Sequence, residues 1–162
     1  MNSKEYENAI SFFGKSSQKV PENRDPYLLR AIGIVCFAMS KPIKPKMRTK
    51  MLKDAKRDLN RALNASPKDW QVLYLRGLLN FALHFFYDAI VDLEMVIEKS
   101  DDANAKHYLA RGRCYACLSM FKEAITDLSI AINLNSNLLD AYLNRGKCAY
   151  LIGDTGLAFM DF

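Results

Sequence analysis

One short pattern recurs three times at a nearly fixed interval, and it constrains the fold more than any other feature of the chain. Arg-Gly pairs place glycines at Gly77, Gly112 and Gly146, which are 35 and 34 residues apart. An alanine follows each glycine twelve residues later, and a large apolar residue follows four residues after that: Ala89 and Leu93, Ala124 and Leu128, Ala158 and Phe162. A fixed period in this range indicates stacked supersecondary units.

Residues 105–138 show the plan of one unit. Apolar residues recur at helical intervals in two sets, first Tyr108, Leu109, Tyr115 and Leu118, then Ala124, Ile125, Leu128, Ala131 and Ile132. Residues 119–122 between the sets predict a short turn, so the unit is two antiparallel helices. We expect Gly112 and Ala124 where these helices cross, because a missing or minimal side chain lets two backbones approach closely.

This pattern resembles the tetratricopeptide repeat, a helix–turn–helix unit of 34 residues. Counted from Ala105, the family's small residue at position 8 falls on Gly112, its aromatic at 11 on Tyr115 and its alanine at 20 on Ala124. Departures in other copies include Asn80, where an aromatic residue is usual. The resemblance implies an all-α fold, a right-handed superhelical solenoid of antiparallel helix pairs.

The resemblance divides the chain into repeats. Residues 1–20 are expected to form an N-terminal capping helix, a half repeat, because Ala9, Phe13 and Pro21 match a second helix and its closing proline. Residues 21–162 are expected to form the repeat domain. Its repeats are predicted at about 26–69, 70–104, 105–138 and 139–162, the last of them truncated.

The first repeat is predicted to carry a basic insertion. With Gly33 taken as its small residue, Ala55 follows after 22 residues instead of twelve, so the turn between the helices would hold ten extra residues at 41–50. Two prolines exclude a helix from the first half of this segment. The basic residues of the insertion are Lys41, Lys44, Lys46, Arg48 and Lys50.

Positive charge is concentrated in this part of the chain. Residues 41–61 contain nine lysines and arginines against Asp54 and Asp58, a net charge of +7, whereas the whole chain carries +5. Such a cluster fits nucleic acid, an anionic membrane or an acidic protein, and a merely solvated face is the simpler interpretation. No aromatic residue lies among the lysines, which argues against a nucleic-acid partner.

No catalytic, metal or cofactor site is predicted, and we expect the protein not to be an enzyme. Cys114 and Cys117 lie in mid-helix without a second pair, so they are interpreted as core thiols. His107 has no partner histidine nearby, and His84 is expected in a turn. Four cysteines in apolar surroundings predict free thiols and a cytoplasmic protein, with a nuclear or ciliary location as an alternative. No apolar run approaches the ~20 residues that span a bilayer.

The family resemblance also implies a concave groove lined by the first helix of each repeat. The corresponding residues are Tyr27, Arg30, Ile34, Phe37, Tyr74, Leu78, Phe81, Lys106, Leu109, Arg113, Lys147 and Tyr150. Apolar and aromatic residues dominate at one end of this set and cations at the other. We therefore expect a protein or peptide partner that combines apolar anchors with acidic groups.

One family function can be tested residue by residue. Relatives that grip the acidic C-terminal tails of chaperones use a two-carboxylate clamp of lysines, asparagines and an arginine on three successive repeats. The matching positions here hold Arg30, Ile34, Leu75, Lys106 and Ala110, of which only Arg30 and Lys106 could serve. The clamp is absent, and chaperone tails are not expected as partners.

The sequence thus predicts a non-enzymatic interaction module, or scaffold, that binds a partner peptide or helix in the groove. An alternative is a structural segment of a larger assembly, ciliary or trafficking in type, that self-associates through its C-terminal end. Its basis is the apolar stretch that ends at Phe162. A third interpretation is contact with anions or nucleic acid through residues 41–61.

Overall fold

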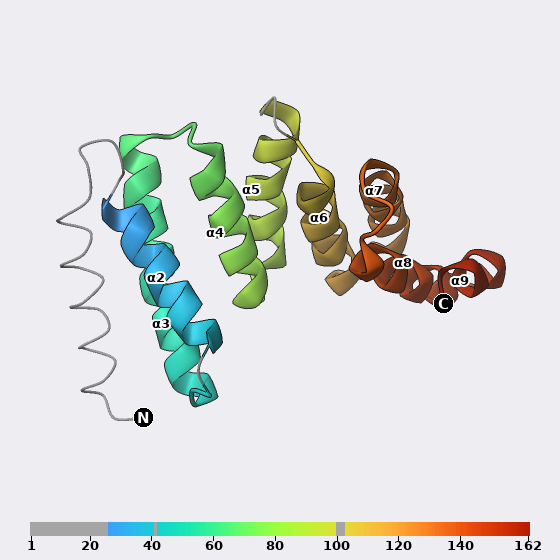
Figure 1. Ribbon diagram of the computed structural model, residues 1–162, viewed down its shortest axis with the longest axis horizontal. Helices are drawn as coiled ribbons and strands as arrows, with labels where there is room; N and C mark the ends of the chain where they lie inside the picture. Colours follow the sequence, from blue (N-terminus) through green and yellow to red (C-terminus); the bar gives the residue numbers. More distant parts are fainter. Residues whose placement is uncertain (1–25, 41, 100–102) are drawn as a thin grey trace. The chain divides into compact units, whose positions relative to one another are not determined.

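The computed structural model confirms an all-α protein. It describes residues 26–162 except 41 and 100–102, so the predicted capping helix at 1–20 lies outside the described residues. The helices of the described part are α2 (Pro26–Ser40), α3 (Pro45–Ala65), α4 (Trp70–Ala82), α5 (Phe86–Lys99), α6 (Ala105–Cys117), α7 (Phe121–Leu134), α8 (Leu139–Leu151) and α9 (Thr155–Asp161), shown in Figure 1.

The chain divides into two compact units. The first is Met1–Leu83, in which α3 packs against both α2 and α4. The second is His84–Phe162, in which each helix from α5 to α9 packs against the next and α6 also packs against α8. The predicted repeat at 70–104 is therefore shared between the units, with α4 in the first and α5 in the second.

Side-chain caps fix where several helices begin. The Asp69 carboxylate accepts hydrogen bonds from the backbone N–H groups of Gln71 and Val72 at the start of α4. At the start of α6, Asn104 and His107 form a capping box in which the backbone N–H of Asn104 donates to Nδ1 of His107. Caps of this kind satisfy N–H groups that the first turn leaves without helical partners. His107 therefore has a structural role.

The first helix of three repeats ends in the same way. His84, Ser119 and Gly153 stand at matching positions of their turns, with φ angles of 63°, 60° and 84°. A left-handed residue just after a helix reverses the chain and ends the helical hydrogen bonding. His84 is thus a turn residue, as the sequence predicted.

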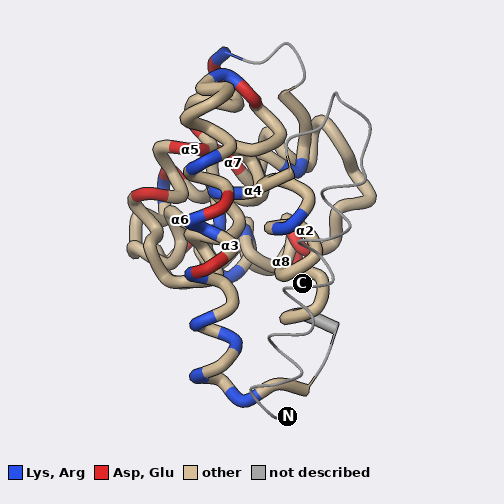
Figure 2. Tube along the Cα trace, turned by 90° about the vertical axis from the view of Figure 1, so that its left-hand side faces the viewer, with Lys and Arg blue, Asp and Glu red and all other residues tan. Residues whose placement is uncertain are grey.

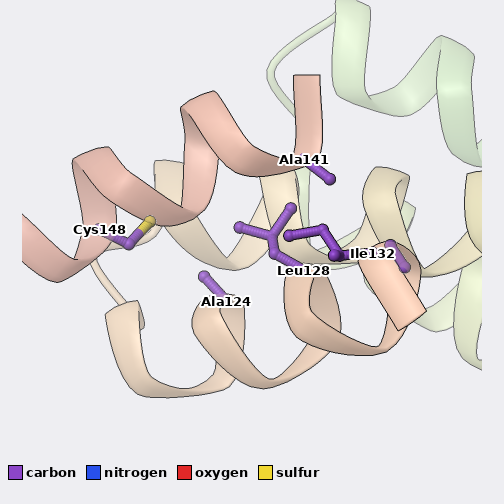
Figure 3. Packing of buried hydrophobic residues seen from close by; sticks show 6 residues of the cluster. Ala124, Leu128, Ile132, Ala141 and Cys148 are labelled. Carbon is purple, nitrogen blue, oxygen red and sulfur yellow. The ribbon is translucent and has the colours of Figure 1, made fainter. Parts of the chain in front are cut away.

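Small residues at the predicted crossing hold α6 and α7 together. Leu128 and Ile132 of α7 point toward the helix that carries Ala141 and Cys148, which closes the core between repeats (Figure 3). A Cβ atom added to Gly112 would lie 3.0 Å from Cγ of Leu128 and 3.3 Å from the carbonyl oxygen of Ala124. The expected close approach of Gly112 and Ala124 is confirmed.

In each of three helix pairs, α2–α3, α6–α7 and α8–α9, an arginine of the first helix also forms an ion pair with a buried aspartate of the second, which the sequence analysis did not identify. Arg111 donates through Nε and Nη2 to the carboxylate of Asp127, both at 2.8 Å. Arg145 makes the same two contacts with Asp161, at 2.8 and 2.7 Å. In the first unit, Arg30 contacts the buried Asp58 through Nε at 2.6 Å and also through Nη2. The pairing raises the pKa of each arginine.

These ion pairs correct the register of the first repeat. Arginine and aspartate are 16 residues apart in the pairs of Asp127 and Asp161 but 28 apart in the pair of Arg30 and Asp58. The first repeat therefore holds twelve extra residues. Ala31, which follows Arg30 and is almost completely buried, takes the place of Gly112 and Gly146. The assignment of Gly33 as the small residue is wrong by two positions.

The extra residues mostly lengthen the helices. The predicted ten-residue turn is wrong in its second half, because α3 begins at Pro45 and continues through Lys50. Proline is tolerated at a helix start because its missing N–H would have no helical acceptor there. As a result α2 has 15 residues and α3 has 21, compared with 13 in α6 and 14 in α7.

The crossing of α6 and α7 should not tolerate a methyl group at Gly112. We expect Gly112→Ala to lower the free energy of unfolding by about 1–3 kcal/mol, because the new Cβ overpacks the contact with Leu128. Gly156→Ala is the matched control, since its added Cβ would meet nothing closer than 3.7 Å. Urea unfolding followed by circular dichroism measures both, and equal stability of the two variants would contradict the close crossing.

The ion pair of Arg111 and Asp127 should show the asymmetry of a buried charge. We expect Arg111→Met to cost about 3–5 kcal/mol of stability, because it leaves the Asp127 carboxylate buried without its partner. Arg111→Met/Asp127→Leu should recover most of that loss. The exposed Lys122→Met serves as the control. A loss in Arg111→Met no larger than the control's would show that the pair does not hold the helices.

Candidate functional site

The second unit presents one exposed face built from α6 and α8. In α6 a stripe with spacing three, four and four contains Lys106, Leu109, Arg113 and Cys117. The matching positions of α8, 34 residues later, are Asp140, Leu143, Lys147 and Leu151, and the predicted groove residue Tyr150 directly precedes Leu151. Because α6 packs against α8 and both stripes have the same register relative to the repeat glycine, the stripes lie side by side.

The α6–α8 face combines cations with apolar groups. Lys106, Arg113 and Lys147 are exposed, whereas Leu109 is half-buried against the core. Leu143 is 44% exposed and the Tyr150 side chain 67%. Such a face can form charge-assisted hydrogen bonds to carboxylates and bury apolar side chains beside them.

In the first unit, three of the predicted groove residues of α2, namely Tyr27, Arg30 and Ile34, lie beside residues of α3. Arg30 is held by Asp58, and the guanidinium groups of Arg30 and Arg61 lie 5.7 and 5.4 Å from the centre of the Tyr27 ring. Ile34 is 2% exposed, so its assignment to an open groove is wrong. Phe37 is half-buried. The two-residue error in register explains this outcome.

The corrected register brings a different set of α2 residues to the open face. Counted from Arg30 and Ala31, the groove positions fall on Ile32, Val35 and Cys36. These residues line an apolar cavity of about 290 Å³ with residues of α3 and α4. The full lining is Ala31, Ile32, Val35, Cys36, Leu52, Leu59, Leu75, Leu78, Leu79 and Ala82.

Among the predicted groove residues of α4, Leu78 lines this cavity, whereas Tyr74 and Phe81 are half-buried. Burial raises the pKa of Tyr74. The other lining residues were missed. Arg76 and Asp92 have the same 16-residue separation as the two ion pairs of the second unit, but Arg30 and Asp58 are 28 residues apart, so this separation does not reveal the register of α2.

The basic residues of the predicted insertion lie largely on α3. Lys46, Lys50, Lys53 and Arg57 follow a helical spacing and are exposed, and the blue segments along α3 in Figure 2 show this concentration. Arg57 pairs with Asp54, and Nε of Arg48 donates to the Ala38 carbonyl oxygen at 3.2 Å. Lys44 precedes the first turn of α3, and Lys41 lies outside the described residues.

The buried thiols of Cys114 and Cys148 are poorly suited to redox chemistry. Burial raises the pKa of Cys114 to about 12 and also raises that of Cys148. The thiolate is the reactive form of cysteine, so both groups are unreactive near neutral pH. Within the part of the chain that the structure describes, no three His, Cys, Asp or Glu side chains gather as metal ligands, and no helix is long and apolar enough to cross a membrane.

The C-terminal part of the second unit exposes apolar side chains on α8 and α9. Phe159 is 87% exposed, and Met160 and Phe162 are also largely exposed. Phe159 occupies the position of Ile125, which packs against the core shared with α8 in the preceding repeat. This face is therefore apolar and exposed in the described structure.

Comparison with solved structures places the fold among known repeat proteins. No protein-family model matches the chain. A crystal structure of MamA is similar with a TM-score of 0.66 and 26% identity over 75% of this chain and 72% of that one. YrrB, described as a TPR protein with an unusual peptide-binding site, gives a TM-score of 0.71 and 19% identity over 92% of this chain and 70% of its own.

A third structure agrees with these two. TTC0263, a thermophilic TPR protein of Thermus thermophilus, gives a TM-score of 0.69 and 16% identity, covering 88% of this chain and 72% of that one. The architecture of the helix pairs is thus that of a solenoid of repeats.

The cysteines should differ sharply in reactivity. We expect iodoacetamide at pH 8 to modify the exposed Cys36 and Cys117 in the native protein, and Cys114 only after denaturation.

The Cys114 thiol should also make stability depend on pH. It loses its proton near pH 8.5 in the unfolded chain and near pH 12 in the native protein, so the free energy of unfolding should fall by up to about 1.4 kcal/mol per pH unit between these values. Cys114→Ala should lack this contribution. If iodoacetamide modified Cys114 in the native protein as fast as it modifies Cys117, the burial of the Cys114 thiol would be contradicted.

Proposed function

We propose that this chain, whose fold is that of the tetratricopeptide repeats, is a non-enzymatic interaction module that binds a segment of a partner protein. The observation that carries the proposal is the α6–α8 face, where Lys106, Arg113 and Lys147 flank Leu143 and Tyr150. The preferred ligand is an acidic segment with aliphatic or aromatic anchors. The peptide-binding site named for YrrB supports this use of the fold.

The chemistry of this face favours an extended acidic segment. Arginine and lysine donate hydrogen bonds to carboxylates, and such charged pairs are stronger than neutral ones. An aromatic ring such as Tyr150 supplies a large apolar contact with few rotatable bonds. Free thiols fit a reducing compartment, and we propose the cytoplasm, with the nucleus or cilium as the alternative.

A second candidate function is assembly through the C-terminal apolar face. The exposure of Phe159 and Phe162 favours it, because the equivalent side chains Ile125 and Leu128 pack against the core shared with α8. Contact with anions through the exposed lysines of α3 is a further candidate, in which Arg57 is paired with Asp54.

Charge reversal on α6 and α8 tests the first proposal. Peptides are selected on the wild-type protein from a display library that mixes acidic, aliphatic and aromatic positions, and their affinities are measured by calorimetry. Arg113→Glu/Lys147→Glu should weaken binding roughly tenfold or more, because each lost charge-assisted hydrogen bond contributes about 1.5–3 kcal/mol. Lys99→Glu/Lys122→Glu is the control, with the same change in net charge elsewhere on the second unit.

The outcomes separate the candidates. If peptide binding survives charge reversal on α6 and α8, this face is not the binding site. If peptide binding is instead lost in Lys46→Glu/Lys50→Glu, the binding site lies on α3. Equal losses in the test and control variants would indicate unspecific attraction. Sedimentation of the wild type over a range of concentrations tests assembly, and a mass that grows with concentration and falls in Phe159→Asp would favour the second candidate.

A further inference from the structure

We propose that the cavity between α2, α3 and α4 is a second binding site, which accepts an uncharged aliphatic or aromatic side chain of a partner protein. The first unit supplies every lining residue. The proposal shares with the previous one the premise that the chain binds proteins. It concerns other residues, however, and each can fail without the other.

The cavity arises from the altered first repeat. In the second unit α6 packs directly against α8, whereas in the first unit the main contacts of α2 and α4 are with α3. The two first helices thus form the walls of the cavity, and buried side chains of α3, Leu52 and Leu59, form its floor. Ile32 and Leu78 at its mouth are 38% and 37% exposed, so the cavity opens to solvent.

The lining determines which group can enter. Apart from the Cys36 thiol, every lining side chain is a hydrocarbon. A carboxylate, phosphate or ammonium group placed there would lose its hydration without gaining a partner, which is costly. A leucine- or phenylalanine-sized side chain would gain from leaving water at about 25 cal/mol per Å² of buried apolar area. The cavity volume of about 290 Å³ leaves room for one such group.

The same repeat position carries opposite chemistry in the two units. Ile32 and Leu78 occupy the ninth position of their repeats in the corrected register, where the second unit has Arg113 and Lys147. The open faces of the first helices are therefore apolar in one unit and cationic in the other. This contrast assigns uncharged anchors to the first unit and acidic groups to the second.

A side chain anchored from a peptide fits the mouth better than a free lipid chain does. A peptide backbone lying across the opening would cover Ile32 and Leu78. A lipid acyl chain inserted end-on would leave these two side chains exposed to solvent. Apolar anchors inserted into pockets, with surrounding contacts that exclude water, are the usual energetic centres of protein interfaces. The occupant is thus a side chain that is part of a partner polypeptide.

Small amino-acid probes test the cavity on the full chain. N-acetyl-leucinamide, N-acetyl-phenylalaninamide and an N-acetyl-aspartate amide are titrated while methyl resonances of Ile, Leu and Val are followed by NMR. The first two probes should shift the methyl groups of Ile32, Val35 and Leu79 in a saturable way, and the acidic probe should not. Bound probe should also slow alkylation of Cys36 and leave Cys117 unchanged, so that one exposed thiol controls for the other.

Two variants address the cavity itself. Ala82→Trp should fill it from its rim and abolish the shifts, and Leu78→Lys should weaken probe binding roughly tenfold by placing a charge at the mouth. Leu134→Lys is the matched control, because it makes the same exchange at an exposed position of the second unit. Unchanged methyl shifts of Leu63 and Val72, which are buried in the first unit and do not line the cavity, show that a variant is folded.

Several results would overturn the proposal. Shifts that do not saturate, or that persist in Ala82→Trp, would show that the probes bind elsewhere. Saturable shifts with lauric acid but none with the amides would make the cavity a lipid site. Shifts of the same methyl groups on raising the protein concentration alone would make the occupant a second copy. Arg113→Glu/Lys147→Glu should leave the probe shifts intact, which keeps this test independent of the α6–α8 face.

Discussion

The buried arginine–aspartate pair is the interaction that fixes how the helices of this protein pair. It joins α2 to α3, α6 to α7 and α8 to α9 at the same place, beside the small residue that lets the two helices cross. Arg145 also donates to the hydroxyl of Ser129, which ties the fourth repeat to the third. Because a buried carboxylate without its partner is costly, the pair permits one register of the helices and opposes sliding.

That constraint links an insertion to a cavity. Twelve extra residues enter the first repeat without moving Arg30 from Asp58, so they extend α2 and α3 beyond the crossing instead of disturbing it. The open face of α2 then carries Ile32 and Cys36 toward α4. Because the contact between Arg30 and Asp58 stays fixed, the extra residues of the first repeat lead to a new apolar surface on α2.

The two units present different surfaces with the same architecture. Apolar side chains surround the opening between α2 and α4, whereas lysine and arginine flank the apolar groups of α6 and α8. The helices and turns determine where the ninth position of a repeat points, and the residue at that position determines what the surface attracts. A repeat array can change its partners in this way without changing its fold.

The sequence by itself determined the helix pairs, their period, the crossing at Gly112 and the turn at His84, because these depend on local spacing and on residues with few conformational alternatives. It also placed Arg113 and Lys147 at matching positions of α6 and α8, because these repeats have the regular length. Only the tertiary structure decided the register of α2. A glycine at position 33 and an alanine at 31 are both small, and local spacing does not distinguish them. The contact between Arg30 and Asp58, 28 residues apart, does. The cavity depends on the same long-range contact, since its walls come from two repeats and its floor from a third helix.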